Sequence, residues 1–147
     1  MLKLLPFTHD VDVVFGSRTV QTFILSGANM GWFLRWGNWF VAKLTEVLFN
    51  TVYLSDVGCT FRVLRRSAID AMRDDFTGNG SSFGFEMMLH AARLRLPLVQ
   101  VPVKYQERVG VSAVTGDRRK TVSLGLEMIA MCLRTRAQAG RLGSPLR

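Results

Sequence analysis

The chain contains little cysteine, and its cysteines are not paired in any motif. Cys59 and Cys132 are the two cysteines among 147 residues, and neither belongs to a CxxC pair. A zinc site or thioredoxin-type chemistry therefore has no support. We expect a reduced, cytoplasmic setting in which both thiols are packing groups.

Long uncharged apolar runs are also missing. No run reaches the roughly 18 residues that a membrane-spanning helix needs, and Met1–Phe7 is too short for a signal peptide. We find no internal repeat or low-complexity tract. The length predicts one domain, residues 1–136, followed by a disordered tail, residues 137–147, which contains Gly, Ser and Pro.

Acidic residues are scarce. The chain has 11 of them against 19 lysines and arginines, so its net charge is +8, while 48% of its residues are hydrophobic. This composition predicts a globular protein with anionic partners, which include nucleotide phosphates, lipid phosphates, a membrane surface and nucleic acid. The charge does not choose among these partners.

The stretch from Asp56 to Arg66 organises the chain. Asp56 and Gly58 favour a turn, and the apolar residues after them favour a short strand. Arg62 then lies close to Asp56 across the bend, as a cation beside a carboxylate. The alternative, a capped turn with solvated arginines, stays open.

The remaining elements follow from periodicity and from turn residues. We expect strands over residues 11–15 and 98–105, and helices over residues 29–49, 67–75, 83–93 and 121–136. Ser67 is the expected N-cap of the second helix. Pro102 predicts that its strand lies at an edge of the sheet or carries a bulge.

Two helices have apolar faces with two interpretations each. The apolar face of the first helix has four-residue spacing and consists of Trp32, Trp36, Phe40 and Leu44. The apolar face of the last helix has similar spacing and consists of Val122, Leu126, Ile129 and Leu133. Tryptophans with nearby basic residues suit a membrane interface, whereas aromatics at helical spacing are usually core. We favour the core for the first helix, and the last can pack on the domain or lie on a membrane.

Several polar residues are candidates for a site, each with a structural alternative. Arg18 follows the turn Gly16–Ser17 and can reach a phosphate, and residues 106–120 form a basic, glycine-containing loop that can embrace one. Either segment can instead be solvated surface. Glu86 begins a helix, where the dipole favours a carboxylate, or it acts in catalysis. We expect His90 to be a partly buried histidine satisfied by hydrogen bonds rather than a ligand.

Taken together, these segments resemble the C-terminal half of glycosyltransferase family 2, of the dolichol-phosphate-mannose-synthase-like type. The resemblance lies in the order and spacing of DVVFGSR (12–18), SDVGCTFRVLRRSAI (55–69), SSFGFEMMLHAARLRLPLVQVPVKYQERVGVSAVTGD (81–117) and the helix after them. These segments cover most of residues 11–136.

The resemblance implies an α/β fold of the GT-A type and transfer of a sugar from a nucleotide-sugar donor, commonly to a polyprenyl phosphate at the inner membrane face. It implies phosphate-facing roles for Arg18, Arg35 and Arg108, with Ser112 as a weaker candidate. Asp56 and Glu86 are the candidate catalytic carboxylates, and Arg62, beside the Asp56 turn, is a further anion-binding candidate.

The sequence departs from the family at its start. The nucleotide-binding strands and the DxD motif that holds Mg²⁺ or Mn²⁺ are expected before residue 11, and Asp10 and Asp12 abut the strand too closely to be that motif. We therefore expect a truncated enzyme without metal ligands, inactive alone, that self-associates or docks on a missing N-terminal half. The alternatives are a purely structural half-domain and a non-catalytic basic module that binds anionic membrane or nucleic acid. Nucleic acid is the weaker partner, because the aromatics cluster in one helix.

Overall fold

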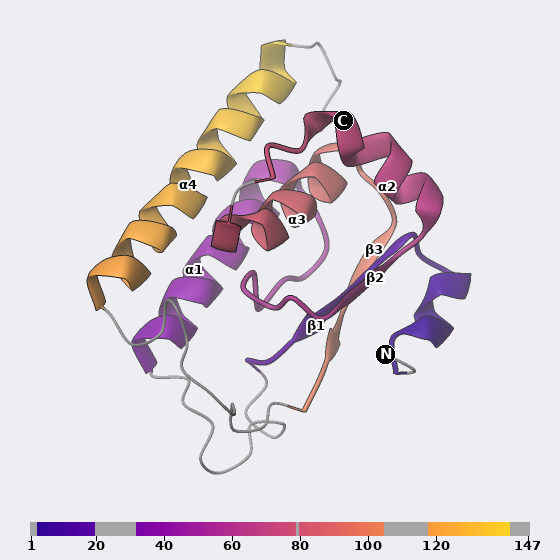
Figure 1. The fold of residues 1–147 in the computed structure, drawn as a ribbon, viewed down its shortest axis with the longest axis horizontal. Coiled ribbons are helices and arrows are strands. Elements are labelled where there is room, and N and C mark those ends of the chain that lie inside the picture. The colour runs from indigo at the N-terminus through magenta and orange to yellow at the C-terminus, as the bar shows by residue number, and fades with distance from the viewer. Residues whose placement is uncertain (1–2, 20–31, 79, 105–117, 142–147) are drawn as a thin grey trace.

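The computed structural model describes residues 3–19, 32–78, 80–104 and 118–141 (Figure 1). This part is α/β, with a small mixed sheet and four α-helices, as the sequence predicts. In chain order the elements are η1 (Leu5–His9), β1 (Val13–Ser17), α1 (Trp32–Phe49), β2 (Arg62–Leu64), α2 (Arg66–Met72), η3 (Arg73–Asp75), η4 (Gly80–Ser82), α3 (Phe83–Arg93), β3 (Leu98–Pro102) and α4 (Arg118–Arg141).

The sheet has the strand order β2-β1-β3. β1 is antiparallel to β2 and parallel to β3, with Phe15 paired to Arg62 on one side and to Gln100 on the other. Val103 N–H bonds Ser17 O, and Val13 N–H bonds Pro97 O. Because backbone groups alternate along a strand, Pro102 faces away from β1 and its missing N–H costs no ladder bond. The predicted edge position of this strand is confirmed.

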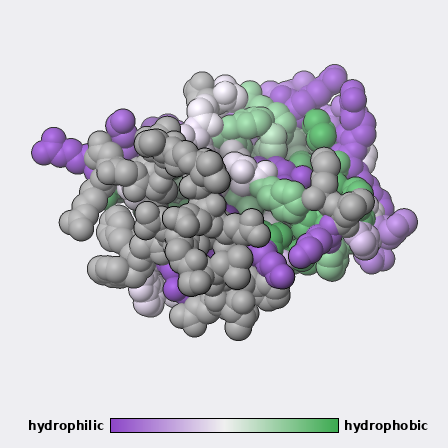
Figure 2. Space-filling view, turned by 60° about the horizontal axis from the view of Figure 1, so that its bottom comes forward, coloured by the Kyte–Doolittle hydropathy of each residue, from purple (hydrophilic) through white to green (hydrophobic). Residues whose placement is uncertain are grey.

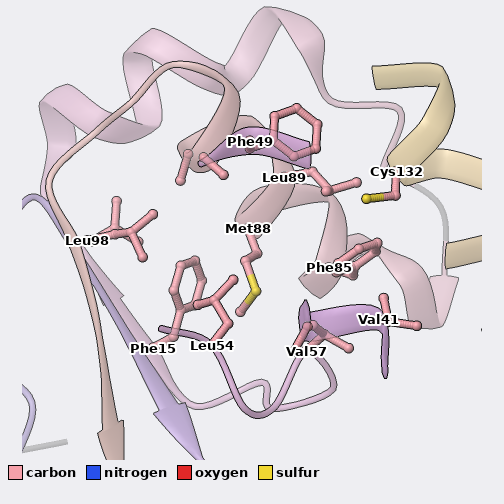
Figure 3. Packing of buried hydrophobic residues seen from close by; sticks show 14 of the residues in the cluster. Phe15, Val41, Phe49, Leu54, Val57, Phe85, Met88, Leu89, Leu98 and Cys132 are labelled. Carbon is pink, nitrogen blue, oxygen red and sulfur yellow. The ribbon is translucent and has the colours of Figure 1, made fainter. Parts of the chain in front are cut away.

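The core lies between one face of the sheet and the α-helices. Figure 3 shows Phe15 and Leu98 from the strands facing side chains of α3, with Phe49 of α1 and Cys132 of α4 closing the cluster. Residues 54 and 57, between α1 and β2, also enter it. The loop that carries Asp56 is therefore anchored by its own apolar neighbours, Leu54 and Val57, which are almost completely buried.

Several element boundaries differ from the prediction. β1 runs from Val13 to Ser17, so Gly16 and Ser17 belong to the strand and do not form the predicted turn. α4 begins at Arg118, three residues earlier than expected. α2 begins at Arg66 after an extended Arg65, so Ser67 lies inside the first turn and is not the N-cap. β3 ends at Pro102, earlier than expected. α4 continues to Arg141, so residues 137–141 are helical and do not belong to a disordered tail. The alanine- and arginine-containing sequence of this last turn favours helix.

The exposed face of α1 corrects the expectation that its aromatics are core. Trp36 is 61% exposed and Phe40 53% exposed, with Trp39 packed edge-on against Trp36 at 5.6 Å between ring centroids. The core side of the helix is instead formed by smaller residues and one phenylalanine: Val41, Ala42, Thr45 and Phe49. The side chains of Trp32 and Phe33 lie outside the described set.

α4 shows the same inversion. The face that periodicity singles out is exposed at Val122, Leu126 and Leu133, and the buried residues are centred about a third of a turn away around the helix. The buried side contains Met128, Cys132, Thr135 and Ala139, and Thr45 of α1 meets the Cys132 sulfur at 3.7 Å. Small residues at this contact let the two helices approach closely.

The second face of the sheet is less completely covered. Val14 on this face is fully buried, whereas its register neighbours Val63 and Val99 are half-buried. Figure 2 shows hydrophobic residues gathered on its right-hand side, which is the side of the sheet and η1 in Figure 1. Phe7 of η1, which contributes to the exposed apolar surface, is 40% exposed.

Candidate functional site

A polar network forms at the carboxyl end of β1 and β3. The two strands are parallel, so Ser17 at the end of β1, with Arg18 after it, and the end of β3 meet at the same edge of the sheet. Residues 54–58, between α1 and β2, lie across this edge and complete the network. Ligands of open α/β sheets bind outside the carboxyl ends of strands, so this is the edge where a site is expected.

Arg18 and Asp56 form the centre of the network. The Arg18 guanidinium donates from Nε to Asp56 Oδ2 at 2.8 Å and from Nη2 to Oδ1 at 3.0 Å, and its backbone N–H donates to Oδ2 at 2.9 Å. Gly58 N–H reaches Oδ1 at 2.9 Å. The Asp56 side chain is completely buried, and that of Arg18 is 23% exposed. The ion partner of Asp56 is therefore Arg18, not the Arg62 that proximity in sequence suggested.

Gln100 of β3 fixes the backbone on which Asp56 sits. Its Oε1 accepts from Ser55 N–H at 2.6 Å and from Asp56 N–H at 3.2 Å, and its Nε2 donates to Asp56 O at 2.6 Å. A donor and an acceptor on one amide thus imitate a strand neighbour. Sequence reasoning missed Gln100, and its one signal was a polar residue inside an otherwise apolar strand.

Two buried hydroxyls extend the network to β1. Ser55 Oγ donates to Gln100 Oε1 at 3.1 Å, because that amide oxygen only accepts. Ser17 Oγ lies 2.7 Å from Ser55 Oγ, so Ser17 is the donor in that pair. Thr19 Oγ1 lies 3.1 Å from Ser17 Oγ and 3.2 Å from Ser55 O. The arrangement orders the backbone just after β1, where Arg18 begins.

α1 holds the other side of the same loop. Glu46 accepts from Leu54 N–H at 2.5 Å, and Lys43 donates to Leu54 O at 3.1 Å. Asn38 lies so close to Gly58 that a Cβ there would be 3.2 Å from Asn38 Oδ1. Arg35, a predicted phosphate-facing residue, is half-buried one turn before Asn38.

Arg62 acts as a clamp between a loop and a helix. Its Nη2 donates to Cys59 O at 2.7 Å and its Nη1 to Gly84 O at 2.7 Å, while the guanidinium lies over the Phe15 ring. Burial lowers the pKa of Arg62 from its ordinary value. Within the described residues no carboxylate lies within ion-pair distance of it. These guanidinium donors are directed at protein acceptors, which fits a structural role better than anion binding.

Glu86 anchors the segment that precedes α3. Its carboxylate accepts from Thr77 N–H at 2.8 Å, from Thr77 Oγ1 at 2.7 Å and from Gly78 N–H at 3.3 Å. Burial alone would raise the pKa of Glu86, but the hydrogen bonds from Thr77 and Gly78 outweigh it and lower the pKa. None of these partners belongs to the Arg18–Asp56 network, so the two predicted catalytic carboxylates have separate surroundings.

His90 lies one turn after Glu86. Its Nε2 is 3.9 Å from Glu86 Oε1, and its ring packs edge-on against Phe76. Burial and the neighbouring Arg93 lower the pKa of His90, so it is neutral near pH 7. Its Nδ1 is buried without a hydrogen-bond partner in the described structure. The burial agrees with the predicted packing role, but the prediction that the ring is satisfied by hydrogen bonds is wrong at Nδ1.

The described residues do not gather a metal site. No group of three His, Cys, Asp or Glu side chains is placed to hold a metal ion among them. Asp56 and Glu86 are both taken up by protein donors. Asp12, part of the rejected DxD pair, bonds Arg65 at the amino end of β1, the opposite end of the strand from Arg18. Arg108 and Ser112 lie outside the described residues.

Both cysteines are buried, as expected for packing groups, and burial raises the pKa of each thiol.

A separate hollow of about 320 Å³ lies between η4 and α4, where Ser82 Oγ donates to Glu127 at 2.7 Å. None of its lining residues belongs to the Arg18–Asp56 network. Within the described ranges, no helix has the length and apolar character needed to cross a bilayer.

Compared with known proteins, the chain matches no protein-family model. No solved structure matches it significantly.

Proposed function

We propose that the chain is a portion of a glycosyltransferase with a GT-A-like fold, which transfers a sugar from a nucleotide-sugar to a polyprenyl phosphate. The observation that carries the proposal is the Arg18–Asp56 pair at the carboxyl ends of two parallel strands. A buried carboxylate that holds an arginine in one orientation prepares that arginine for a phosphate.

The occupied state of Asp56 fits this chemistry. A phosphate acceptor is already an anion, so transfer to it needs no strong general base, and the main requirement is neutralisation of charge. In such enzymes a divalent cation supplies part of that neutralisation at the leaving diphosphate. Of this chain's residues, Arg18 is the one that we assign to phosphate binding with support from geometry, while Arg35, Arg108 and Ser112 are proposed on the resemblance.

The test is binding of farnesyl phosphate, a short polyprenyl phosphate, with farnesol as the matched neutral control. We expect the phosphate to bind and the alcohol not to, and we expect Arg18→Ala to weaken binding of the phosphate by about tenfold, one lost charged hydrogen bond. Equal binding of both compounds, or no effect of Arg18→Ala, would contradict the proposal. We expect no sugar transfer by this chain alone, and metal-dependent turnover would overturn that expectation.

A peripheral contact with an anionic membrane is the second candidate function. It is favoured by the exposed aromatics of α1, Trp36, Trp39 and Phe40, on a chain with a net charge of +8. Tryptophan rings are stable at the level of lipid headgroups.

The test is sedimentation with vesicles of phosphatidylcholine, with and without phosphatidylserine. We expect binding to the anionic vesicles, loss of it in Trp36→Ala/Phe40→Ala, and no change in Ile69→Ser, an exposed apolar residue on α2. Binding that survives the double substitution would assign the contact to another surface. Concentration-dependent dimers that the same double substitution abolishes would identify a second copy as the occupant of this face.

A further inference from the structure

The Gln100 side chain of β3 binds Ser55 and Asp56, in the loop after α1, through its one amide group. Its oxygen faces two backbone N–H donors and one hydroxyl, and its nitrogen faces one carbonyl, so the orientation of the amide is fixed by its partners. The contact reaches across 44 residues of sequence, from β3 to the loop after α1. Every polar atom of this side chain is therefore used.

We propose that Gln100 is a positioning residue, whose neutral amide sets the backbone at Asp56 and thereby the orientation of Arg18. The chain of contacts is short. Gln100 binds the N–H and C=O of Asp56, the Asp56 carboxylate binds Arg18 at three points, and Arg18 is the group assigned to phosphate. The positioning rests on the geometry, and its consequence for phosphate binding rests on the proposed function.

The charge state at position 100 decides whether the network closes. A glutamate there has the same length, but its ionised form places a carboxylate oxygen against Asp56 O, where the amide nitrogen now donates at 2.6 Å. A protonated glutamate donates from its O–H to that carbonyl and restores the contact. The charged groups of the same network are Asp56 and Arg18, and Arg62 lies in the same row of the sheet, across Phe15.

A substitution at this position therefore acts as a titratable reporter. Burial and the nearby Asp56 carboxylate favour the protonated form of the introduced carboxyl group, whereas the Ser55 and Asp56 N–H donors and the Arg18 cation favour the ionised form. Gln100→Glu therefore loses the contact where its carboxyl group is ionised and regains it where that group is protonated. The exposed Gln138 of α4 offers the same substitution without a network and is the matched control. Gln100→Met keeps the length and stays neutral, but it cannot hydrogen-bond at any pH.

The experiment follows the Arg18 Nε–H signal by NMR, because that proton is bound to Asp56 Oδ2. In the unmodified chain and in Gln138→Glu we expect slow exchange with water throughout pH 5–8, after correction for the intrinsic pH dependence of exchange. In Gln100→Glu we expect exchange about tenfold faster at pH 8 and recovery at pH 5, whereas Gln100→Met stays fast at both.

Farnesyl phosphate binding is measured on the same samples and distinguishes the positioning role of Gln100 from the proposed function. Affinity that follows the Arg18 signal supports both. An Arg18 signal that responds while neither the unmodified chain nor Gln138→Glu binds the phosphate supports the positioning role and counts against the proposed function. Slow exchange in Gln100→Met, or no recovery of Gln100→Glu at a pH where NMR shows its carboxyl group to be protonated, overturns the positioning role. Circular dichroism at each pH checks that the variants remain folded, and a loss of helix in the neutral Gln100→Met shows a fold requirement instead, which also overturns it.

Discussion

Asp56 is completely buried, and among the residues that the structure describes three of the four hydrogen bonds that its carboxylate accepts come from Arg18. Two residues 38 positions apart are thus joined by backbone and side chain together. A carboxylate that is this fully occupied orients its partner and is not placed to take a proton from a substrate. The pair is the natural starting point for tests of stability.

We predict that removing one member of the pair destabilises the fold strongly. Arg18→Ala leaves a buried carboxylate without its cation, and we expect a loss of about 3 kcal/mol in the free energy of unfolding. Asp56→Ala leaves a partly exposed arginine that water can reach, so its cost is smaller. Urea denaturation of both single variants and the double variant measures the coupling.

The exposed pair Arg66–Asp70 on α2 is the control for this prediction. Its side chains are 83% and 45% exposed, so Asp70→Ala should change stability by less than about 1 kcal/mol. If the losses of unfolding free energy in Arg18→Ala and Asp56→Ala were additive, and as small as the loss in Asp70→Ala, the pair would not be the centre of the network.

Gly58 provides a second prediction, because its missing side chain leaves room for the pair. A methyl group at this position would lie 2.9 Å from Arg18 Nη2 and 3.2 Å from Asn38 Oδ1. Arg18 is held by Asp56 and cannot yield freely, so Gly58→Ala should cost about 1–3 kcal/mol. The measurement is again the midpoint of urea unfolding.

Gly37 of α1 is the matched control, since an added Cβ there meets nothing within 4 Å. Alanine is the better helix former, so Gly37→Ala should stabilise by about 0.5–1 kcal/mol. Similar midpoints for the two alanine variants would show that Arg18 moves aside without cost.

Local patterns predicted much of the secondary structure and less of the packing. The helix at residues 83–93 and the edge position of Pro102 follow from periodicity and from the missing proline N–H, and both are confirmed. The faces of α1 and α4 were misjudged, because the direction of burial depends on which helix lies alongside. Small residues such as Ala42 and Cys132 form that contact, while the larger Trp36 and Leu126 remain outside.

The site was predicted in part. Arg18 and Asp56 were both singled out, but their pairing depends on β1 lying beside the 54–58 loop, which spacing alone does not encode. Gln100 was missed because its role depends on how the three strands are aligned, with Phe15 of β1 paired to Gln100 on one side and to Arg62 on the other. An amide that binds backbone groups has no sequence motif.

His90 predicts how stability depends on pH. Its pKa is lowered in the folded protein by burial and by Arg93, against the opposing effect of Asp75 and Glu86. As pH falls below about 6.5, the unfolded chain binds a proton that the folded chain resists, so stability is full above that pH and decreases below it.

We therefore expect the melting temperature to fall between pH 7 and pH 5, and His90→Gln to reduce that fall. The exposed His9 is the other histidine of the chain, and His9→Gln is the matched control. If the melting temperature depended on pH in the same way in His90→Gln and His9→Gln, the acid sensitivity would belong to other groups.

Glu86 gives the last prediction, which separates an anchoring role from a catalytic one. Three hydrogen bonds tie its buried carboxylate to Thr77 and Gly78, so Glu86→Gln turns one acceptor into a donor that faces an N–H. We expect a cost of about 1–3 kcal/mol and faster amide hydrogen exchange at residues 77 and 78. Because the pKa of Glu86 is lowered, its ionised form stabilises the fold above the ordinary pKa of a glutamate, and this contribution is lost as pH falls through the lowered value.

Asp74, 92% exposed in the same segment, is the control, and Asp74→Asn should change neither exchange nor stability. Thr77→Val removes one of the three hydrogen bonds while keeping the shape, so its effect should lie between those of Asp74→Asn and Glu86→Gln. If Glu86→Gln left the exchange of residues 77 and 78 unchanged, the anchor would be unimportant and a chemical role for this carboxylate would regain support. If exchange accelerates in the expected order, burial and the loss of hydrogen bonds account for Glu86 without any substrate.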